Sequence, residues 1–201
     1  MMKHGSVWLI AMILLTGCDV QPKSPPTARP PIHEPEGIND DPKEVSEAVP
    51  TVPAEFNAKV IKIIDGDTVD VLTDAKETIR VRLNGIDCPE RGQPFGNNAK
   101  YFVSESIAGQ MVRIATHGDD RYDRYDRTIG DIYHDGELIN LSLVKAGLAW
   151  HYVKYAPDDT ALREAEQQAR RLEKGLWSGS HKIIAPWDWR RLSKEERDEY
   201  R

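Results

Sequence analysis

Cysteine is scarce in this sequence, which has only Cys18 and Cys88 among its 201 residues. Two cysteines cannot supply the disulfide framework on which many small secreted domains depend, so the fold must be stabilised by its own core. The six histidines show no spacing typical of metal ligands, which argues against a zinc site. No histidine stands at a telling spacing from Cys88, so we expect this thiol to be buried and inert rather than nucleophilic.

Long hydrophobic runs are also missing. The run Val7–Leu15 is too short to span a membrane, and the sequence then reads Leu15-Thr16-Gly17-Cys18. This pattern is typical of a secretory signal peptide over residues 1–18. The ending resembles a bacterial lipobox, which implies cleavage before Cys18 and lipid attachment to its sulfur; the alternative is an ordinary signal peptide that contains a cysteine. We therefore expect an exported lipoprotein, anchored in the membrane of the cell envelope and facing the periplasm.

Aromatic residues are absent from residues 19–53, which hold nine of the thirteen prolines and seven acidic residues against three basic ones. Such a segment cannot bury enough apolar surface to fold, and we expect a semi-extended spacer. The predicted organisation is therefore a signal peptide (1–18), a disordered linker (19–53), one folded domain (54–180) and a C-terminal tail (181–201).

Positive charge is not in excess either. The formal net charge is −6, and residues 54–201 alone carry 23 basic and 26 acidic residues. This near balance argues against broad, non-specific binding of a duplex through counterion release. It still allows a small cleft whose local charge is positive.

What the sequence does contain, from Phe56 onward, is a series of short apolar runs rich in valine and isoleucine, which is typical of β-strands. Five strands are predicted: 58–64, 68–72, 78–86, 111–115 and 129–133. Helical spacing over 97–107 predicts a helix that interrupts the strands. The order of these elements predicts an α+β fold with a mainly β core, a five-stranded Greek-key barrel of the OB-fold type with three flanking helices.

The other two helices follow the fifth strand. Asn140 is a suitable N-cap for a helix over 141–146, and Asp158 or Asp159 is suitable for a longer helix that ends near Gly175. One apolar face of this longer helix is predicted from its spacing: Leu162, Ala165, Ala169 and Leu172.

Two acidic turns carry the candidate chemistry. Asp65-Gly66-Asp67-Thr68 separates two strands, and an Asp-Gly pair there is also an ordinary hairpin turn. Asp87-Cys88-Pro89-Glu90 ends the third strand, where it is alternatively a loop of solvated acids. Alternation along that strand places Arg82 on a polar face with its neighbours Arg80 and Asn84. Carboxylates from two turns suit a hard cation, and arginine suits a phosphoryl group.

These motifs, followed by Arg127, resemble the staphylococcal nuclease-like (thermonuclease) family in order and spacing over about residues 56–178. The resemblance implies the same OB barrel and an endonuclease that hydrolyses DNA and RNA and leaves 3′-phosphate ends. It implies Ca²⁺ as cofactor, single-stranded nucleic acid as the preferred partner, and a monomer. Position by position, it assigns catalysis to Arg82, Glu90 and Arg127, metal binding to Asp67, Asp87 and the carbonyl of Cys88 with Asp65 in support, and substrate binding to Tyr155 and Tyr125.

The sequence departs from the family at two places. Asp126 stands where the family has glycine before the second arginine, and this acid is expected to compete with phosphate for Arg127. A second tyrosine of the family falls on Val153, with Tyr152 beside it. Near the C-terminus, Trp187 and Trp189 either stack on bases or pin the tail to the domain. The rival functions are a binding module that has lost catalysis and a structural domain of the envelope.

Overall fold

A computed structural model describes residues 53–117, 122–179 and 182–200. The predicted signal peptide, its lipobox residue Cys18 and residues 19–52 of the predicted linker lie outside the described residues. Within the described part of the chain, no helix combines the length and apolar character needed to cross a membrane.

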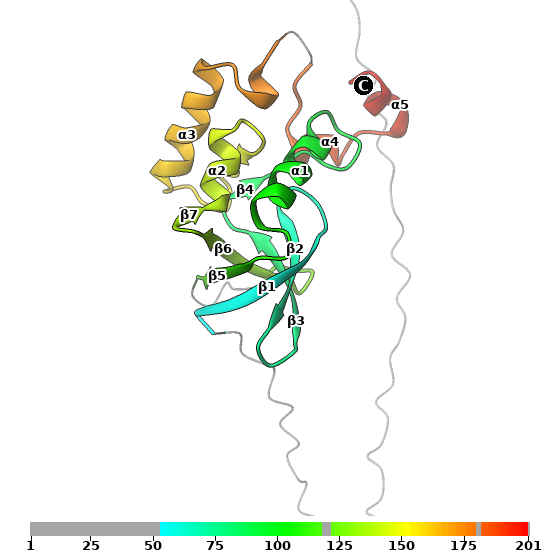
Figure 1. Cartoon of the computed structure of the whole chain (residues 1–201). Coiled ribbons are helices and arrows are strands. Elements are labelled where there is room, and N and C mark those ends of the chain that lie inside the picture. The colour runs from blue at the N-terminus through cyan, green and yellow to red at the C-terminus, as the bar shows by residue number, and fades with distance from the viewer. Residues whose placement is uncertain (1–52, 118–121, 180–181, 201) are drawn as a thin grey trace, which may run out of the picture. The chain divides into compact units, whose positions relative to one another are not determined.

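Five strands close into a barrel, as the sequence predicts (Figure 1). They are β1 (Glu55–Ile63), β2 (Thr68–Thr73), β3 (Thr78–Leu83), β5 (Met111–Thr116) and β6 (Thr128–His134). Neighbours in the order β3-β2-β1-β5-β6 are antiparallel, and a parallel pairing of β3 with β6 closes the barrel. The predicted fold class is therefore confirmed.

Three two-residue strands occur besides these five. β7 (Glu137–Leu138) pairs antiparallel with β6, and β4 (Ile86–Asp87) pairs with β8 (Trp150–His151) in a separate small sheet. The predicted third strand over 78–86 was too long, because β3 ends at Leu83 and Gly85 turns the chain at a φ of 71°. This break aims Asp87 at the end of the barrel rather than along its wall.

The barrel interior is filled by one side chain from every second strand position, as the alternation requires. On β3, Val81 and Leu83 are buried while Arg80 is exposed. Branched aliphatic side chains dominate the core: Val60, Val69, Val71, Val81, Leu83, Val112, Ile114 and Ile132.

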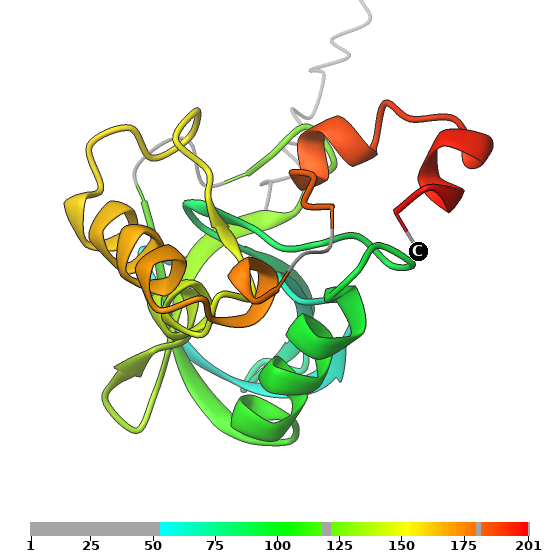
Figure 2. The ribbon, with the colours of Figure 1, turned by 90° about the horizontal axis from the view of Figure 1, so that it is seen from above.

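Helices flank the barrel in Figure 2, where α1 is green and α3 is orange. The first, α1 (Gly96–Ile107), buries Ala99, Val103 and Ile107 against the core. The third, α3 (Thr160–Arg171), begins at Asp159, whose side chain accepts a hydrogen bond from Leu162 N at 2.9 Å. Leu172 was wrongly predicted on its apolar face: the helix ends at Arg171, and Leu172 is 56% exposed.

The prediction of Asn140 as an N-cap was wrong. The helix α2 (Ile139–Lys145) begins two residues earlier than predicted, after Leu138, so that Asn140 lies inside it. Its buried side chain accepts a hydrogen bond from Ile132 N (3.1 Å) and donates to Asn84 O (3.0 Å). Asn140 therefore ties α2 to β6 and to the turn after β3, because buried polar groups need partners that a capping position would not provide.

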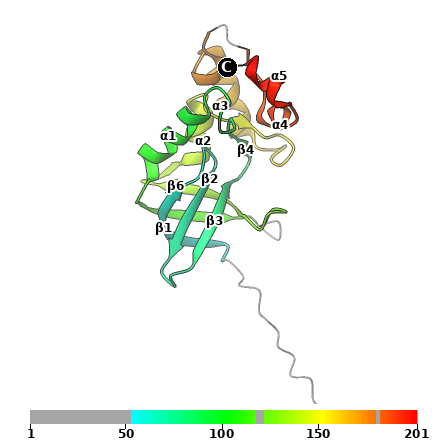
Figure 3. The same cartoon turned by 90° about the vertical axis from the view of Figure 1, so that its right-hand side faces the viewer.

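The C-terminal segment is folded onto the domain. After the 3₁₀ turn Gly175–Trp177, the chain forms α4 (Pro186–Trp189) and α5 (Lys194–Asp198), and α5 starts with a capping box between Ser193 and Glu196. Trp187 stacks on Tyr152 and packs against a second core cluster, which favours the alternative that tryptophan pins the tail to the domain. Figures 1 and 3 place α4 beside the end of the barrel at which β4 lies.

Candidate active site

The turn between β1 and β2 is held by its own polar groups. The backbone N–H groups of Ile64 and Asp65 donate to Thr68 O, and Asp67 N donates to Asp65 Oδ1 at 3.1 Å. Gly66 is required by space, since a Cβ there would lie 2.7 Å from Ala99 Cβ and 2.8 Å from Cys88 Cβ. The turn therefore presents Asp67 rigidly to the third strand.

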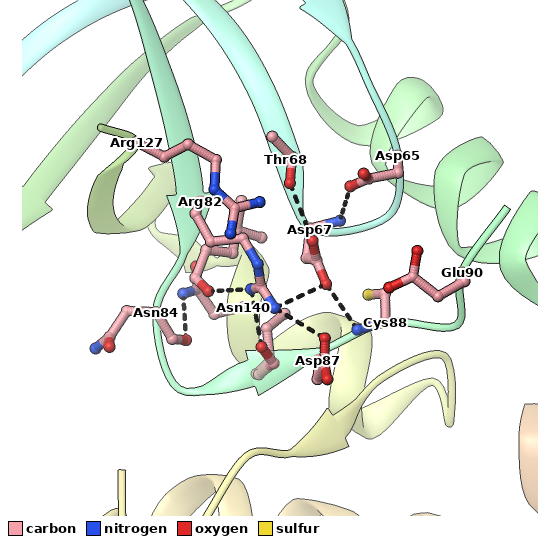
Figure 4. Close-up of polar contacts among 12 residues, drawn as sticks. Asp65, Asp67, Thr68, Arg82, Asn84, Asp87, Cys88, Glu90, Arg127 and Asn140 are labelled. Atoms are coloured by element: carbon pink, nitrogen blue, oxygen red, sulfur yellow. Dashed lines mark hydrogen bonds and ion pairs between the residues drawn. The ribbon is translucent and has the colours of Figure 1, made fainter. Parts of the chain in front are cut away.

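Asp67 and Asp87 converge on one guanidinium (Figure 4). Arg82 Nη2 lies 3.1 Å from Asp67 Oδ2 and 2.9 Å from Asp87 Oδ1. Its Nη1 donates to the carbonyls of Leu83 (2.7 Å) and Ile86 (2.8 Å), which orients the fork. Acidic side chains from two separate turns thus meet beside Arg82, as the sequence predicts.

Burial and mutual repulsion change the pKa values of the charged groups in this cluster. Burial, followed by the charge of Asp67, raises the pKa of Asp87 to about 6. The same two causes raise the pKa of Asp65 to about 6. Burial disfavours the charge of Arg82, but the negative charges of Asp67 and Asp87 outweigh it and raise the pKa of Arg82 above its ordinary value. Further positive charge at this position would therefore stabilise the ionised carboxylates.

The residues present fit a hard divalent cation. Asp87 Oδ2 is buried and has no hydrogen-bond partner among the described residues, which is costly for a carboxylate oxygen. Asp67, Asp87 and the Cys88 carbonyl offer only oxygen donors, the kind that calcium and magnesium prefer. Within residues 53–117, 122–179 and 182–200, no three His, Cys, Asp or Glu side chains gather as a metal cage, so backbone and water oxygens would complete the coordination.

The Cys88 side chain is buried and its thiol stays protonated. It is 3% exposed, and burial raises the pKa of its thiol well above the ordinary value. Its backbone N–H instead donates to Asp67 Oδ2 at 2.7 Å, which links the two acidic turns. An inert, buried thiol is what the sequence predicts.

Glu90 lies at the edge of the same cluster. Its backbone N–H donates to Gln93 Oε1 at 2.9 Å, and Gly96 lets α1 start against its carbonyl, since a Cβ there would lie within 2.3 Å of Glu90 O. Its side chain is 38% exposed, and Oε1 accepts a 2.6 Å hydrogen bond from Arg190 Nε. Glu90 is therefore accessible to solvent beside the buried carboxylates.

Arg190 is the site residue that the sequence analysis missed. Besides Glu90, it donates from Nη2 to Asp87 Oδ1 at 2.6 Å. The sequence analysis considers the segment 186–191 only for its two tryptophans. The signal that could have indicated Arg190 is the pair of arginines that directly follows Trp189.

Comparison with known proteins identifies the family of this chain. The model of the family described as "Staphylococcal nuclease homologue" matches residues 80–179. A protein of Shigella flexneri called "Micrococcal nuclease" is 40% identical over 151 residues, covering 70% of this chain and 84% of its own. The chain belongs to the staphylococcal nuclease homologue family.

Two more relatives of this nuclease family match over similar lengths. "Protein ParB" of Escherichia coli is 42% identical over 158 residues, with 73% of this chain and 85% of ParB covered. An "Uncharacterized endonuclease" of Haemophilus influenzae is 40% identical over 136 residues, with 68% and 74% covered.

Arg127 is held by Asp123, not by Asp126. Arg127 Nε donates to Asp123 Oδ2 at 2.7 Å, and Asp123 Oδ1 accepts the backbone N–H groups of Tyr125 and Arg127. Burial acts to raise the pKa of Asp123, but these hydrogen bonds outweigh it and hold the pKa below its usual value. Asp126 has a φ of 57°, so it takes a left-handed turn position, which glycine adopts most readily.

The two predicted substrate tyrosines are solvent-facing. Tyr125 is 63% exposed and Tyr155 is 62% exposed. The guanidinium carbon of Arg127 lies 5.4 Å from the Tyr125 ring centroid. Tyr155 packs edge-on against Tyr152 (4.8 Å), which stacks on Trp187 at 5.1 Å, so Tyr152 adds an aromatic contact beside the exposed Val153.

Proposed function

We propose that this chain is an endonuclease that hydrolyses phosphodiester bonds of DNA and RNA with little sequence preference, depends on Ca²⁺, and leaves 3′-phosphate ends. The observation that carries the proposal is the meeting of Asp67 and Asp87 at Arg82 Nη2, 3.1 and 2.9 Å away, next to the unpartnered Asp87 Oδ2. A buried acidic cluster of this kind is the place for a cation, and a guanidinium beside it is the place for a phosphate.

Each residue has a separate task. Arg82 Nε donates to none of the described residues, and it would hold a non-bridging phosphate oxygen. Arg127, which Figure 4 shows reaching toward the side of Arg82, would hold another as negative charge grows in the transition state. Asp67, Asp87 and the Cys88 carbonyl would bind the calcium ion, which supplies positive charge to the phosphate when bound.

Glu90 would act on the nucleophile. Its Oε2 takes a proton from a water molecule as the water oxygen bonds to phosphorus. The bond between phosphorus and O5′ breaks, and O5′ takes a proton from solvent to become a hydroxyl. The phosphate stays on the 3′ side, which gives the proposed products.

Single strands are the preferred substrate in this proposal. The rings of Tyr125, beside Arg127, and of Tyr155, beside Tyr152, are exposed and available to bases, and base stacking on aromatic rings does not depend on sequence. The near balance of charge over residues 54–201 also favours a local contact over a long electrostatic track on a duplex. We expect the enzyme to act as a monomer.

The assay is digestion of single-stranded DNA and RNA by the chain from residue 19 onward, with Ca²⁺ and with a chelator. We expect cleavage with calcium only, and 3′ ends that must be dephosphorylated before a polymerase extends them. Glu90→Gln should lower the rate of cleavage about 10²- to 10⁴-fold, while Glu105→Gln, an exchange of the same kind on α1, should leave it unchanged. Binding of nucleic acid without cleavage would favour the alternative, a binding module; cleavage that persists under chelation would reject the metal assignment.

The proposed place of action is the cell envelope, with a lipid anchor on Cys18. The support is the apolar run Val7–Leu15 followed by the lipobox-like Leu15-Thr16-Gly17-Cys18. Metabolic labelling of the full chain with a fatty acid should mark the wild type and spare Cys18→Ser. Equal labelling of both would reject the anchor.

A further inference from the structure

We propose that Arg190 is a positioning residue of the active site: it holds one oxygen of Glu90 and one oxygen of Asp87, and leaves the second oxygen of each carboxylate open. This inference rests on the proposed nuclease function. It adds a residue that lies outside the matched range 80–179.

One guanidinium bridges the two acids. Arg190 Nε lies 2.6 Å from Glu90 Oε1, and Nη2 lies 2.6 Å from Asp87 Oδ1, both short charge-assisted hydrogen bonds. The remaining oxygens are unengaged: Glu90 Oε2 accepts no hydrogen bond from the described residues, and Asp87 Oδ2 is buried without a partner in this part of the chain. These are the oxygens that the proposed mechanism assigns to water and to the cation.

The contact differs from an ordinary surface ion pair. Asp87 has no exposed side-chain surface, and 42% of the Arg190 side chain is exposed. The neighbouring pair, Arg191 with Asp188, is 3.3 Å long with 79% and 52% exposure. An exposed pair such as Arg191 with Asp188 contributes almost nothing measurable to the free energy of folding. The pair of Arg190 with Asp87 instead compensates a buried charge. The two adjacent arginines therefore form a matched comparison.

The segment that carries Arg190 is docked at several points. Trp189 is 2% exposed, and the Trp187 ring stacks on Tyr152 with an interplanar angle of 13°. Gln93 connects the segment to the Glu90 loop: its Oε1 accepts from Glu90 N, and its Nε2 donates to Ile184 O at 2.7 Å. The loop and the C-terminal segment thus hold each other, which fixes the position of the Arg190 side chain.

A fixed guanidinium suits the orientation of a general base. Partial burial disfavours its charge, yet the hydrogen bonds from Arg190 to Asp87 and Glu90 and the charges of these acids raise the pKa of Arg190 above its ordinary value, so it stays charged at any working pH. It contacts carboxylates and no site assigned to phosphate. Its removal should therefore slow the chemical step and leave substrate binding almost unchanged.

The experiment compares Arg190→Gln and Arg190→Lys with Arg191→Gln in steady-state cleavage of a single-stranded oligonucleotide at saturating Ca²⁺. Arg190→Gln should lower kcat about 10- to 100-fold, the usual loss for a partner that orients a catalytic group, with KM little changed. Arg190→Lys should recover only part of kcat, because a single ammonium cannot bridge two carboxylates as a planar fork does. Arg191→Gln should match the wild type.

A double-mutant cycle with Glu90→Gln tests whether Arg190 acts through Glu90. In the Glu90→Gln background, Arg190→Gln should lower kcat by a much smaller factor than it does in the wild type. Near-ultraviolet circular dichroism of the tryptophans checks docking of the segment, and Arg190→Lys, which keeps the charge, carries the test if the glutamine variant undocks.

Three results would overturn the inference: a kcat of Arg190→Gln equal to or above that of the wild type, a rise in KM at constant kcat, or additive effects in the cycle. The first would mean that Arg190 is dispensable or blocks the carboxylates, the second that it binds phosphate, and the third that it acts elsewhere. An inactive wild type would instead overturn the proposed function, and the inference with it.

Discussion

Arg190 Nη2 lies 2.6 Å from Asp87 Oδ1, although the two residues stand 103 positions apart in the chain. The same oxygen also accepts from Arg82 Nη2 at 2.9 Å. A carboxylate without exposed surface is thereby compensated by two cations, one from the barrel and one from the C-terminal segment. The site is completed by a part of the chain that the family match does not cover.

Stability of the metal-free protein should fall as pH rises from about 4 to about 6. The pKa of Asp87 is about 6 in the fold and 3.8 ordinarily, so the folded state binds a proton in this range that the unfolded state has released. Because the folded state binds more protons, the free energy of unfolding decreases with pH, by up to about 3 kcal/mol for a shift of this size. Asp65 acts in the same direction.

Urea denaturation in chelator at several pH values measures this slope. Asp87→Asn removes the titrating group, so the difference between variant and wild type isolates its share. Added Ca²⁺ should reverse the trend, since only ionised carboxylates bind the ion. A metal-free stability that rises over this range in the wild type but not in Asp87→Asn would contradict the prediction.

Arg82→Lys and Arg127→Lys should both lose activity but differ in stability. In the proposed mechanism each removes a guanidinium fork from the phosphate, for which we expect a loss of about 10²- to 10³-fold in kcat. Arg82 donates hydrogen bonds to three half-buried or buried acceptors and forms an ion pair with Asp67, and each acceptor left unpaired costs about 1–3 kcal/mol. Arg127 pairs with Asp123 alone among the described acids, so its replacement should change unfolding by about 1 kcal/mol or less. Equal destabilisation of the two variants would refute this contrast.

Asp123→Asn should impair the enzyme, whereas Asp126→Gly should not. Asp123 holds the Arg127 side chain and two backbone N–H groups, so its loss misplaces a catalytic group and should lower kcat about 10-fold or more. Asp126 provides a left-handed turn residue, which glycine adopts readily, so stability should change by about 1 kcal/mol or less. Steady-state kinetics of both variants test this prediction. A higher kcat of Asp126→Gly than of the wild type would show that Asp126 competes with phosphate for Arg127 after all.

Gly66→Ala should destabilise the domain by about 1–3 kcal/mol, as overpacking of a tight site does. The added Cβ would meet Ala99 Cβ at 2.7 Å and Cys88 Cβ at 2.8 Å, so the acidic turn must move. Because that turn presents Asp67, affinity for Ca²⁺ should fall as well. Thermal unfolding and calcium titration measure the two effects, and an alanine variant with wild-type values in both would show that the turn tolerates a side chain.

Several elements follow from local sequence. Alternating valines and isoleucines predict the five barrel strands, because a strand side chain faces either the core or solvent. Asp159 starts α3 because its carboxylate meets an N–H group three residues away. The meeting of Asp67, Asp87 and Arg82 was also predictable. Both acidic turns adjoin the paired strands β2 and β3, so their side chains lie at the same end of the sheet.

Other contacts were decided by the tertiary structure. Asparagine is a residue type that often caps helices, yet packing buries Asn140 inside α2. There its side chain bonds the backbone N–H of Ile132 and the backbone carbonyl of Asn84. Asp123 and Asp126 are equal candidates for Arg127 by sequence, and the backbone of the turn selects Asp123. Arg190 and Arg191 are equivalent neighbours, and only docking of the tryptophans aims one of them at Asp87 and Glu90. Local patterns are determined by bonded neighbours and burial, whereas the partner of a charged side chain depends on which of many similar groups the completed packing brings within hydrogen-bonding distance.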